Sequence, residues 1–379
     1  MNLLFLTENN IYPPRGGTSR ITVTLSKGFE ERGHRCFLAF GQEGLSRDNL
    51  KRTLEENSID IVFCNLVTIQ EKRRVLPSIY DLTRGTSTKV FGCFHAMPGE
   101  ELTGNSIGNC LYRIKRGGEL IRNIKDMILW ATPKPLVKFV FSSRLKNRYR
   151  VLSDNSDKVV LLSETQIRDF ASLAKIPSGE EKFSVVPNAL SFNCFLDESA
   201  LSSKQKEILI LCRMDEKSKR ISDALRIWKK VCEKPVADDW KLTIVGGGSD
   251  LEYFKRKARR MGLVRVSFEG MQEDDLQYYK RASIFMMTSA YEGWGITLTE
   301  AQQMGAVPIV FHSYTSLTDI IEDGKNGVIV GYKDVDEYSR KLLSLMEDDI
   351  TRNKMAREAI ASSHRFSLDV ILDRWEKLF

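Results

Sequence analysis

Short apolar runs alternate along the chain with longer stretches in which apolar residues recur every three to four positions. The short runs are rich in Val, Ile, Leu and Phe and predict β-strands. They lie at residues 3–6, 36–40, 59–64, 90–94, 159–162, 183–186, 208–212, 242–245, 266–268, 284–287, 307–311 and 328–330. Helical spacing lies between them, for example at residues 19–32, 221–232, 250–261 and 335–346. This alternation is typical of βαβ units, in which helices cover both faces of a parallel sheet.

So many strands exceed one open sheet of ordinary size, so we expect an α/β chain with two doubly wound, Rossmann-like domains. The N-terminal domain would span residues 1–188 and the C-terminal domain residues 207–362, joined by a Ser-rich, non-periodic linker at 189–206. The last segment, 363–379, predicts a helix whose aromatic end would pack back on the N-terminal domain. Because open α/β sheets bind ligands beyond the carboxyl ends of their strands, we expect the site in a cleft between the two domains.

The composition is that of an ordinary globular protein, with 42% hydrophobic and 28% charged residues among 379. So much apolar sequence excludes a disordered chain, and no stretch approaches the roughly 18 uninterrupted apolar residues of a membrane helix. The N-terminus reaches Glu8 without a preceding basic region, so we expect no signal peptide. Seven cysteines without a C-x-x-C pair predict buried thiols in a reducing cytosol.

Positive charge is concentrated in residues 113–150. That segment holds eleven Lys or Arg against Glu119 and Asp126, so its net charge is +9. The whole chain has a net charge of +7, so the remaining residues together carry −2. It also carries apolar residues, so it is basic and amphipathic together. Anionic lipid head groups attract such segments by about 1 kcal/mol per basic residue, which favours peripheral contact with the inner membrane face. A solvated basic helix face is the alternative. No nucleic-acid motif accompanies the segment, so we expect no nucleic-acid partner.

Two segments that follow predicted strands suit a phosphate group. Adjacent glycines, Gly16 and Gly17, precede the first helix, where backbone can approach a ligand and the helix N-terminus offers unpaired amides. Arg213 and Lys219 follow the first strand of the second domain, where two cations could grip a diphosphate. An ordinary loop and a polar exposed turn are the respective alternatives. A third segment, Gly246 to Gly248, is a degenerate match to the dinucleotide fingerprint, and a strand-to-helix turn explains it adequately.

The segment from Ser289 to Ala301 carries the most chemistry. Glu292 and Glu300 bracket a Gly-x-Gly turn that follows a strand and opens a helix, which we expect to begin near Trp294. Glu300 would then lie about two turns inside the helix. One glutamate could meet a sugar and the other a ribose, while the amides of Gly293, Trp294, Gly295 and Ile296 face a phosphate between them. A surface helix could carry two idle glutamates, but it would not need Gly-x-Gly at its start.

Taken together, Glu292-x7-Glu300, the upstream Arg213 and Lys219, and Gly16-Gly17 resemble family 4 of the retaining glycosyltransferases, which have the GT-B fold. Further similarities lie at residues 186–188, 268–270, 305–310 and 321–327, so the resemblance spans nearly the whole chain. Two departures from the family pattern are Arg220, where a glycine often follows the lysine, and Trp294, which replaces the commoner phenylalanine.

The resemblance implies a role for each matching residue. Glu292 would contact hydroxyls of the donor sugar and Glu300 the nucleoside ribose, whereas Arg213 and Lys219 would neutralise the departing diphosphate. The loop with Gly16 and Gly17 would close on the same diphosphate. His95, at the end of a strand of the first domain, would approach the sugar; a structural imidazole is the alternative. The nucleobase would lie near Gly270, Met271 and Gln272.

The function so implied is transfer of a hexose or N-acetylhexosamine, with retention, from a UDP- or GDP-sugar to a hydroxyl of a glycan or lipid-linked acceptor. We expect this in bacterial surface polysaccharide or glycolipid synthesis, in the cytoplasm. Neither metal nor cofactor is expected, because Asp334-Val335-Asp336 opens a helix and is interpreted as a cap. The alternatives are a non-catalytic sugar-nucleotide or lipid-binding protein, a nicotinamide-dependent oxidoreductase, a 2-epimerase and a phosphorylase.

Overall fold

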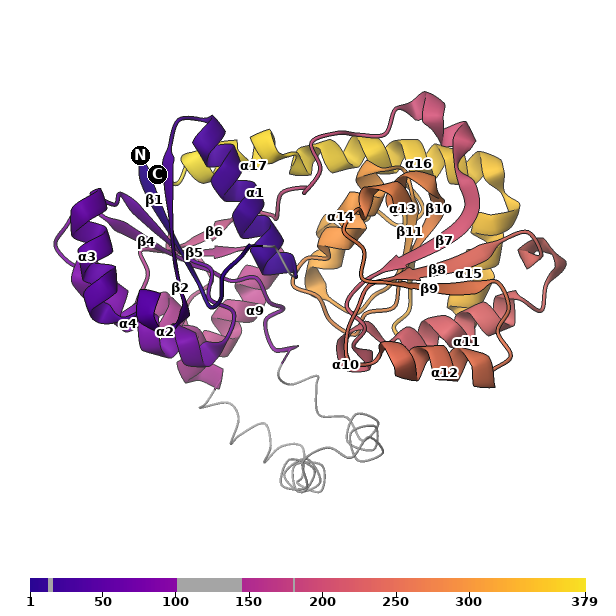
Figure 1. Cartoon of the computed structure of the whole chain (residues 1–379), viewed down its shortest axis with the longest axis horizontal. Coiled ribbons are helices and arrows are strands. Elements are labelled where there is room, and N and C mark those ends of the chain that lie inside the picture. The colour runs from indigo at the N-terminus through magenta and orange to yellow at the C-terminus, as the bar shows by residue number, and fades with distance from the viewer. Residues whose placement is uncertain (13–15, 101–144, 180) are drawn as a thin grey trace, which may run out of the picture. The chain divides into compact units, whose positions relative to one another are not determined.

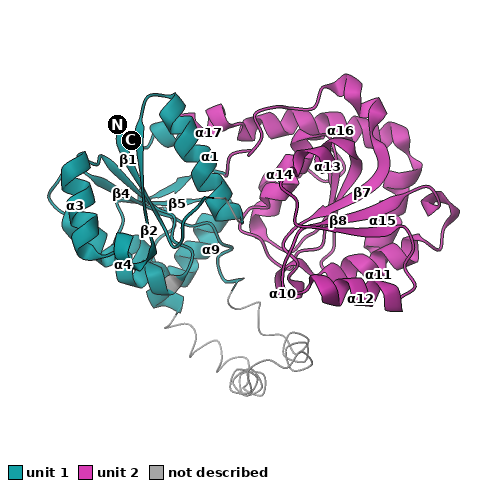
Figure 2. Ribbon diagram, in the orientation of Figure 1, with its two compact units in different colours: residues 1–187, 374–379 teal, residues 188–373 magenta. Residues whose placement is uncertain are grey.

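A computed structural model of the chain describes residues 1–12, 16–100, 145–179 and 181–379 (Figure 1). The chain forms two compact units: unit 1 comprises Met1–Pro187 with Arg374–Phe379, and unit 2 comprises Asn188–Asp373 (Figure 2). Each unit contains one six-stranded sheet with parallel pairing of neighbouring strands. The α/β fold with two doubly wound sheets is therefore confirmed. The expected basic segment, 113–150, lies outside the described residues except for 145–150.

The sheet of unit 1 has the strand order β2-β1-β3-β4-β5-β6. Its strands are β1 (Asn2–Thr7), β2 (Arg35–Phe40), β3 (Ile61–Cys64), β4 (Lys89–Cys93), β5 (Lys158–Leu161) and β6 (Phe183–Val185). The helices are α1 (Gly17–Glu31), α2 (Gly41–Gly44), α3 (Arg47–Asn57), α4 (Ile69–Thr83) and α9 (Glu164–Ala174), and residues 145–154 are also helical. The central strands are apolar at nearly every position because helices bury both faces of a parallel sheet.

The sheet of unit 2 has the strand order β12-β11-β10-β7-β8-β9. Its strands are β7 (Gln205–Leu211), β8 (Lys241–Val245), β9 (Val266–Gly270), β10 (Ala282–Met287), β11 (Val307–Phe311) and β12 (Val328–Val330). The α-helices are α10 (Glu216–Lys219), α11 (Ile221–Val231), α12 (Leu251–Arg260), α13 (Leu276–Arg281), α14 (Ile296–Gln303), α15 (Val335–Glu347), α16 (Asp349–Ser363) and α17 (Leu368–Glu376), which runs into unit 1. Short 3-10 helices lie at η1 (Glu198–Ser203), η2 (Pro235–Ala237), η3 (Thr315–Asp319) and η4 (His364–Phe366).

The order of the strands fixes where each sheet leaves room for a ligand. In unit 1 the chain passes from β1 to β2 on one side and then places β3 on the other side of β1. In unit 2 it passes from β7 through β8 to β9 and then places β10 on the other side of β7. Ligands of open α/β sheets bind at such a switch point, beyond the carboxyl ends of the strands. The loops that follow β1 and β3, and those that follow β7 and β10, are therefore the places to examine.

Residues 189–206, expected as a linker, belong to unit 2 and pack against it. Leu201 of η1 is buried in the core of unit 2. The side-chain amide of Gln303 donates from Nε2 to the backbone carbonyls of Phe192 and Cys194, at 2.8 Å each. This stretch thus bonds to α14 through its backbone, and its η1 packs against α16, which a Ser-rich composition did not indicate.

The C-terminal segment is divided between the units, since only residues 374–379 belong to unit 1. Phe5, Phe63 and Phe91 pair along β1, β3 and β4 and form an aromatic row, in which Phe5 and Phe63 stack with ring centroids 4.7 Å apart. Trp375 packs edge-on against Phe63 at 5.1 Å, and Phe379 lies against the same row. The aromatic end of the chain thus completes the core of unit 1.

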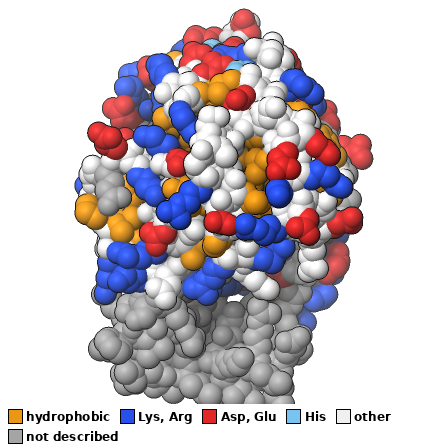
Figure 3. All heavy atoms as spheres, turned by 90° about the vertical axis from the view of Figure 1, so that its left-hand side faces the viewer, with side chains coloured by type: hydrophobic (Ala, Val, Ile, Leu, Met, Phe, Trp, Pro, Cys, Tyr) orange, Lys and Arg blue, Asp and Glu red, His pale blue; other side chains and the backbone are white. Residues whose placement is uncertain are grey.

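The outer surface of α3 and α4 carries mixed charge. Arg47 of α3 pairs with Asp81 of α4 at 2.6 Å, and Arg74 pairs with Glu71 within α4 at 2.5 Å. On the face of unit 1 that Figure 3 shows, basic and acidic side chains are interspersed, with hydrophobic side chains between them. The described side chains on this face are therefore mixed in charge rather than uniformly positive.

A glycine-rich turn follows β8 and packs closely on the loop that follows β7. A Cβ at Gly246, where φ is +132°, would lie 1.9 Å from the carbonyl oxygen of Cys212. The amide of Met214 donates to the carbonyl of Gly247 at 2.8 Å, and a Cβ at Gly248 would lie 2.6 Å from the carbonyl oxygen of Met214. Packing inside unit 2 therefore requires glycine at 246 and 248, and no bound dinucleotide is needed to explain these two.

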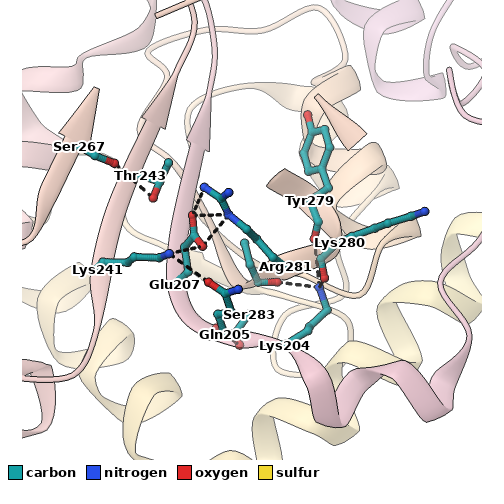
Figure 4. Close-up of polar contacts among 11 residues, drawn as sticks. Lys204, Gln205, Glu207, Lys241, Thr243, Ser267, Tyr279, Lys280, Arg281 and Ser283 are labelled. Atoms are coloured by element: carbon teal, nitrogen blue, oxygen red, sulfur yellow. Dashed lines mark hydrogen bonds and ion pairs between the residues drawn. The ribbon is translucent and has the colours of Figure 1, made fainter. Parts of the chain in front are cut away.

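A polar cluster joins β7, α13 and β8 at the opposite, amino-terminal edge of this sheet (Figure 4). The fully buried carboxylate of Glu207 accepts hydrogen bonds from Arg281, at 2.8 to 3.1 Å, and pairs with Lys241 at 3.1 Å. The ammonium of Lys204 donates to three carbonyls at the carboxyl end of α13, those of Tyr279, Lys280 and Ala282. The negative end of the helix dipole favours a cation there, whereas burial disfavours the charge of Lys204.

We predict that Gly246→Ala destabilises unit 2 by more than about 2 kcal/mol, because the new methyl group would overlap the Cys212 carbonyl. Gly262→Ala is the matched control: Gly262 also has a positive φ, +65°, but a methyl group there would meet no atom within 4 Å. That control should cost only about 1 kcal/mol for the backbone conformation. Equal losses in urea unfolding of the two variants would contradict the packing argument.

Lys204 is expected to make stability depend on pH. Burial lowers its pKa to about 7, whereas unfolded lysine titrates near 10.4, so unfolding takes up a proton between these pH values. The free energy of unfolding should then rise by about 1 kcal/mol per pH unit between roughly pH 7 and 8.5. Lys204→Met should lose this slope, and Lys206→Met, which changes an exposed lysine paired with Asp239, should keep it. Parallel slopes for wild type and Lys204→Met would refute the assignment.

Candidate functional site

The loop after β7 carries two of the expected cations, Arg213 and Lys219. Met214 is buried between them and anchors the loop, while the Arg213 side chain is 73% exposed and its guanidinium lies 3.6 Å from the carboxylate of Asp215. Asp215 caps α10 by accepting from the amide of Lys217 and the hydroxyl of Ser218, at 3.0 Å each. The loop thus has a fixed base from which the Arg213 side chain extends into solvent.

Lys219, at the end of α10, contacts Glu292 of the loop after β10. Its ammonium donates to Oε1 of Glu292 at 2.5 Å, and the two side chains are only 19% and 14% exposed. Burial lowers the pKa of Lys219, but the Glu292 carboxylate more than offsets this effect, so the pKa lies above its ordinary value. Lys219 is therefore a partly buried, permanently charged cation at neutral pH.

Arg220, directly after Lys219, adopts a left-handed conformation with φ of +50° and links α10 to α11. Glycine adopts this conformation without strain, which gives a physical reason for the glycine that the family pattern often has here. Arg220 instead pairs with the buried carboxylate of Asp223, at 2.6 Å.

Several hydrogen bonds fix the loop after β10 against α10. The hydroxyl of Ser289 donates to the same Oε1 of Glu292 at 2.6 Å, and the hydroxyl of Ser313 donates to the carbonyl of Ser289 at 2.7 Å. The amide of Ala290 donates to the carbonyl of Ser218 at 2.7 Å, and Thr288 donates to the carbonyl of Lys219 at 3.0 Å. Ser289, the first residue of the segment 289–301 but one to which the sequence assigned no role, therefore orients Glu292.

Helix α14 begins at Ile296, two residues later than expected. Gly295 takes a left-handed conformation, with φ of +91°, and no side chain caps the helix. The amino-terminal amides of α14 and the positive end of its dipole lie directly after the loop that holds Glu292. The side chain of Trp294 is only 2% exposed and packs edge-on against Phe366, at 5.2 Å, so its ring is part of the interior of unit 2.

Glu300 lies little more than one turn inside α14, because the helix starts later than the expected position near Trp294. Its side chain is fully buried, and Oε2 accepts a hydrogen bond from the hydroxyl of Tyr279 at 2.9 Å. Glu292 and Glu300 thus have different environments: Glu292 pairs with a cation, and Glu300 takes a phenolic hydrogen bond. The ribose role of Glu300 stays a prediction.

The expected nucleobase region lies at the end of β9. The carbonyl of Gly270 accepts from the amide of Gly246 at 2.7 Å, which ties this strand end to the glycine turn. Met271 is 72% exposed, and its side chain borders Gly247. The side-chain amide of Gln272 donates from Nε2 to the backbone carbonyl of Glu269 at 2.7 Å. The exposed, apolar side chain of Met271 thus lies next to the backbone at the end of β9.

The remaining expected residues belong to unit 1. Gly16, with φ of +93°, precedes α1, and Gly17 is its first residue; no side chain caps this helix. His95 is half-buried two residues after β4, and its Nε2 lies 3.2 Å from Oδ1 of Asn65, which directly follows β3. Asn65 was missed, although a polar residue directly after a buried strand was a usable signal.

Lys72 of α4 is a buried lysine that no sequence pattern indicated. Its ammonium lies over the ring of Phe94, 4.9 Å from the centroid, and burial lowers its pKa. Cys64 and Cys93, at the ends of β3 and β4, oppose that shift. The carboxyl edge of the sheet of unit 1 therefore combines polar and cationic side chains around β3 and β4.

Asp334 caps α15 by accepting from the amide of Glu337 at 2.8 Å, and Asp336 pairs with Lys230 at 2.6 Å. The interpretation of Asp334-Val335-Asp336 as a cap is therefore confirmed. Within the described residues, no group of three or more His, Cys, Asp or Glu side chains could hold a metal ion. The described helices also include none with the length and apolar character needed to cross a membrane.

Comparison with known proteins gives a match in unit 2. Residues 195–362 match the model of the family described as "Glycosyl transferases group 1". The "Poly(glycerol-phosphate) alpha-glucosyltransferase" of Bacillus subtilis is 28% identical over 240 residues, which cover 61% of this chain and 34% of that protein. The "Poly(ribitol-phosphate) alpha-N-acetylglucosaminyltransferase" of Staphylococcus aureus is 24% identical over 299 residues, which cover 73% of this chain and 59% of that protein. The chain thus spans about a third to three fifths of the length of these relatives.

The solved structure of Anabaena Alr3699/HepE in complex with UDP and glucose has a TM-score of 0.72 with this chain. The match covers 100% of this chain and 99% of that one at 15% identity, so the two share a fold. The region that matches the family model includes the loops after β7 and β10 and the whole of α14. Residues 195–362, most of unit 2, therefore carry the sequence pattern of glycosyl transferases group 1.

Proposed function

We propose that this protein is a retaining glycosyltransferase that moves a hexose or N-acetylhexosamine from a nucleoside-diphosphate sugar to an acceptor hydroxyl. The family match over residues 195–362 supports glycosyl transfer, and the curated relatives, named for poly(glycerol-phosphate) and poly(ribitol-phosphate), support a role in bacterial surface polymers. UDP in the solved structure of similar fold favours a UDP-sugar over a GDP-sugar as donor. We assign donor binding to unit 2 and acceptor binding to unit 1.

The observation that carries the proposal is the pair of Lys219 and Glu292 at the switch point of unit 2. A departing nucleoside diphosphate gains negative charge, and a cation held in advance stabilises that charge without reorganisation. Lys219 is such a cation, because the structure around it is fixed and it keeps its charge at neutral pH. Arg213 follows the same strand and offers an exposed guanidinium to the same group.

In the proposed reaction the acceptor oxygen forms a bond to the anomeric carbon while the bond from that carbon to the diphosphate oxygen breaks. The proton of the acceptor hydroxyl goes to the departing phosphate oxygen. Attack and departure on the same face of the sugar give retention. The α-linked products in the names of both relatives favour retention if the donor sugar is also α-linked. We further propose that Glu292 receives donor hydroxyls, Glu300 the ribose, and the amides of Gly293 to Ile296 the phosphates.

No metal or cofactor enters this scheme, since Lys219, Arg213 and the amino end of α14 would supply the positive charge. Of the competing functions, a nicotinamide-dependent oxidoreductase is disfavoured because internal packing accounts for Gly246 and Gly248. A binding protein without catalysis differs from the proposal in releasing no nucleoside diphosphate.

Contact of residues 113–150 with the inner membrane face stays a prediction, and it would suit a lipid-linked acceptor.

The first experiment is a thermal-shift panel of UDP- and GDP-sugars, followed by assay of nucleoside diphosphate release with the sugar that binds. Ligand binding to the folded state raises the melting temperature, so one donor should stand out. Release of UDP or GDP that depends on an acceptor would support transfer. Binding without any release would leave a sugar-nucleotide-binding protein and contradict the proposal.

Lys219→Met should lower turnover by about 100-fold or more, the usual loss when one charge-stabilising donor is removed. Glu292→Gln should lower it strongly as well. Lys217→Met is the matched control, because Lys217 is an exposed lysine on the same short helix, and this variant should stay within about twofold of wild type. Thermal melting checks that each variant folds. Full turnover by a folded Lys219→Met variant would exclude Lys219 from leaving-group stabilisation.

A further inference from the structure

We propose that Asn65 is a positioning residue that orients His95 and holds its ring proton on Nε2. That His95 then takes part in handling the acceptor rests on the proposed function, in which unit 1 binds the acceptor. The assignment of the proton rests on hydrogen-bond geometry alone.

A directed chain of hydrogen bonds leads from α1 to His95. The hydroxyl of Thr22 donates to the carbonyl of Thr18, one turn earlier in α1, at 2.9 Å. The oxygen of Thr22 accepts from Nδ2 of Asn65 at 3.0 Å. Oδ1 of Asn65 then faces Nε2 of His95 at 3.2 Å. Because the hydroxyl of Thr22 donates to Thr18, its oxygen accepts from Asn65; because Nδ2 of Asn65 donates to Thr22, Oδ1 is left to face His95.

This chain decides which ring nitrogen carries the proton. An amide oxygen can only accept a hydrogen bond, so Nε2 of His95 must donate and therefore carries hydrogen. Turning the amide of Asn65 around would direct its NH2 group to His95, but the Thr22 hydroxyl would then have to leave the Thr18 carbonyl. The arrangement with Nε2–H makes three hydrogen bonds and the reversed one makes two. In the neutral ring, Nδ1 then holds the lone pair.

The position of Asn65 is as constrained as its polarity. Its side chain is buried, and its backbone amide donates to the carbonyl of Leu6 at 3.0 Å, which continues the pairing of β3 with β1 beyond the last strand residue. Burial of an amide is costly unless its hydrogen bonds are made, so the chain from Thr22 to His95 resists rearrangement. Asn65 also lies at the switch point of unit 1, between the carboxyl ends of β1 and β3.

The tautomer can be measured without activity, by NMR correlation of ring nitrogens and carbon-bound protons in protein with 15N-labelled histidine. The chain has only four histidines, and His95→Gln identifies the signals of His95. The wild type should show the Nε2–H tautomer. Asn65→Leu should lose this preference, and Thr22→Val, which leaves Asn65 in place but frees its amide to turn, should increase the Nδ1–H form. Ser26→Ala, which removes another buried hydroxyl from α1, should change nothing.

Turnover supplies the second readout. Asn65→Leu should lower kcat by at least tenfold while the KM for the donor changes less than twofold, because the donor is assigned to unit 2. An Nδ1–H tautomer in the wild type would overturn the proposal, as would an unchanged tautomer and kcat in both Asn65→Leu and Thr22→Val. If the wild type shows no glycosyl transfer, the proposed function fails, and the spectra still decide whether Asn65 fixes the proton on His95.

Discussion

The ion pair between Lys219 and Glu292 is the interaction on which the account of unit 2 depends. A cation with so little exposure needs an anion within contact, and Glu292 supplies it from a loop more than 70 residues further along the chain. Removing one partner of a buried pair leaves an uncompensated charge and costs several kcal/mol, and less where water reaches the pair, as here. The contacts of Ser289, Thr288 and Ala290 hold the two loops together, so the pair forms before any ligand arrives.

The two edges of the sheet in unit 2 use buried charge differently. At the amino edge, Glu207 is satisfied by two cations and Lys204 by three carbonyls, and every partner is a strand or helix end. That cluster is closed and structural. At the carboxyl edge, Oε1 of Glu292 accepts hydrogen bonds from both Lys219 and Ser289, and the exposed Arg213 stands on the loop beside it. Burial alone does not tell the structural cluster from the candidate functional one. Their positions do, because ligands of open α/β sheets bind at the carboxyl ends of the strands, at the switch point.

The sequence predicted the parallel strands at all the places where the structure has them, because short apolar runs rich in β-branched and aromatic residues alternate with longer stretches of helical spacing. Helix ends were less predictable. Gly295 stops α14 from starting at Trp294 through its left-handed backbone, a property that any glycine can have or lack. The stretch 189–206 contacts α14 through backbone carbonyls and α16 through η1, and these partners lie about 100 residues or more away, so local composition could not reveal its packing.

For the site, charge and spacing singled out Lys219 and Glu292, which the fold brings into contact, but not the residues that hold them. Ser289 and Asn65 are polar residues next to strand ends, and only the three-dimensional neighbourhood shows what they bond. Trp294 was expected to offer its backbone amide to a phosphate, which stays a prediction; its ring lies in the interior of unit 2 against Phe366. Lys72 carries no sequence signal at all.

The most direct test is calorimetric titration of the released nucleoside diphosphate, UDP or GDP, into three proteins. UDP and GDP lack the donor sugar, so Glu292 has no donor-sugar hydroxyls to bind and only competes with the diphosphate for Lys219. Lys219→Met should therefore bind the nucleotide at least tenfold more weakly than wild type, whereas Glu292→Gln should bind it more tightly. Equal affinity of Lys219→Met and wild type would contradict the claim that this lysine holds the diphosphate.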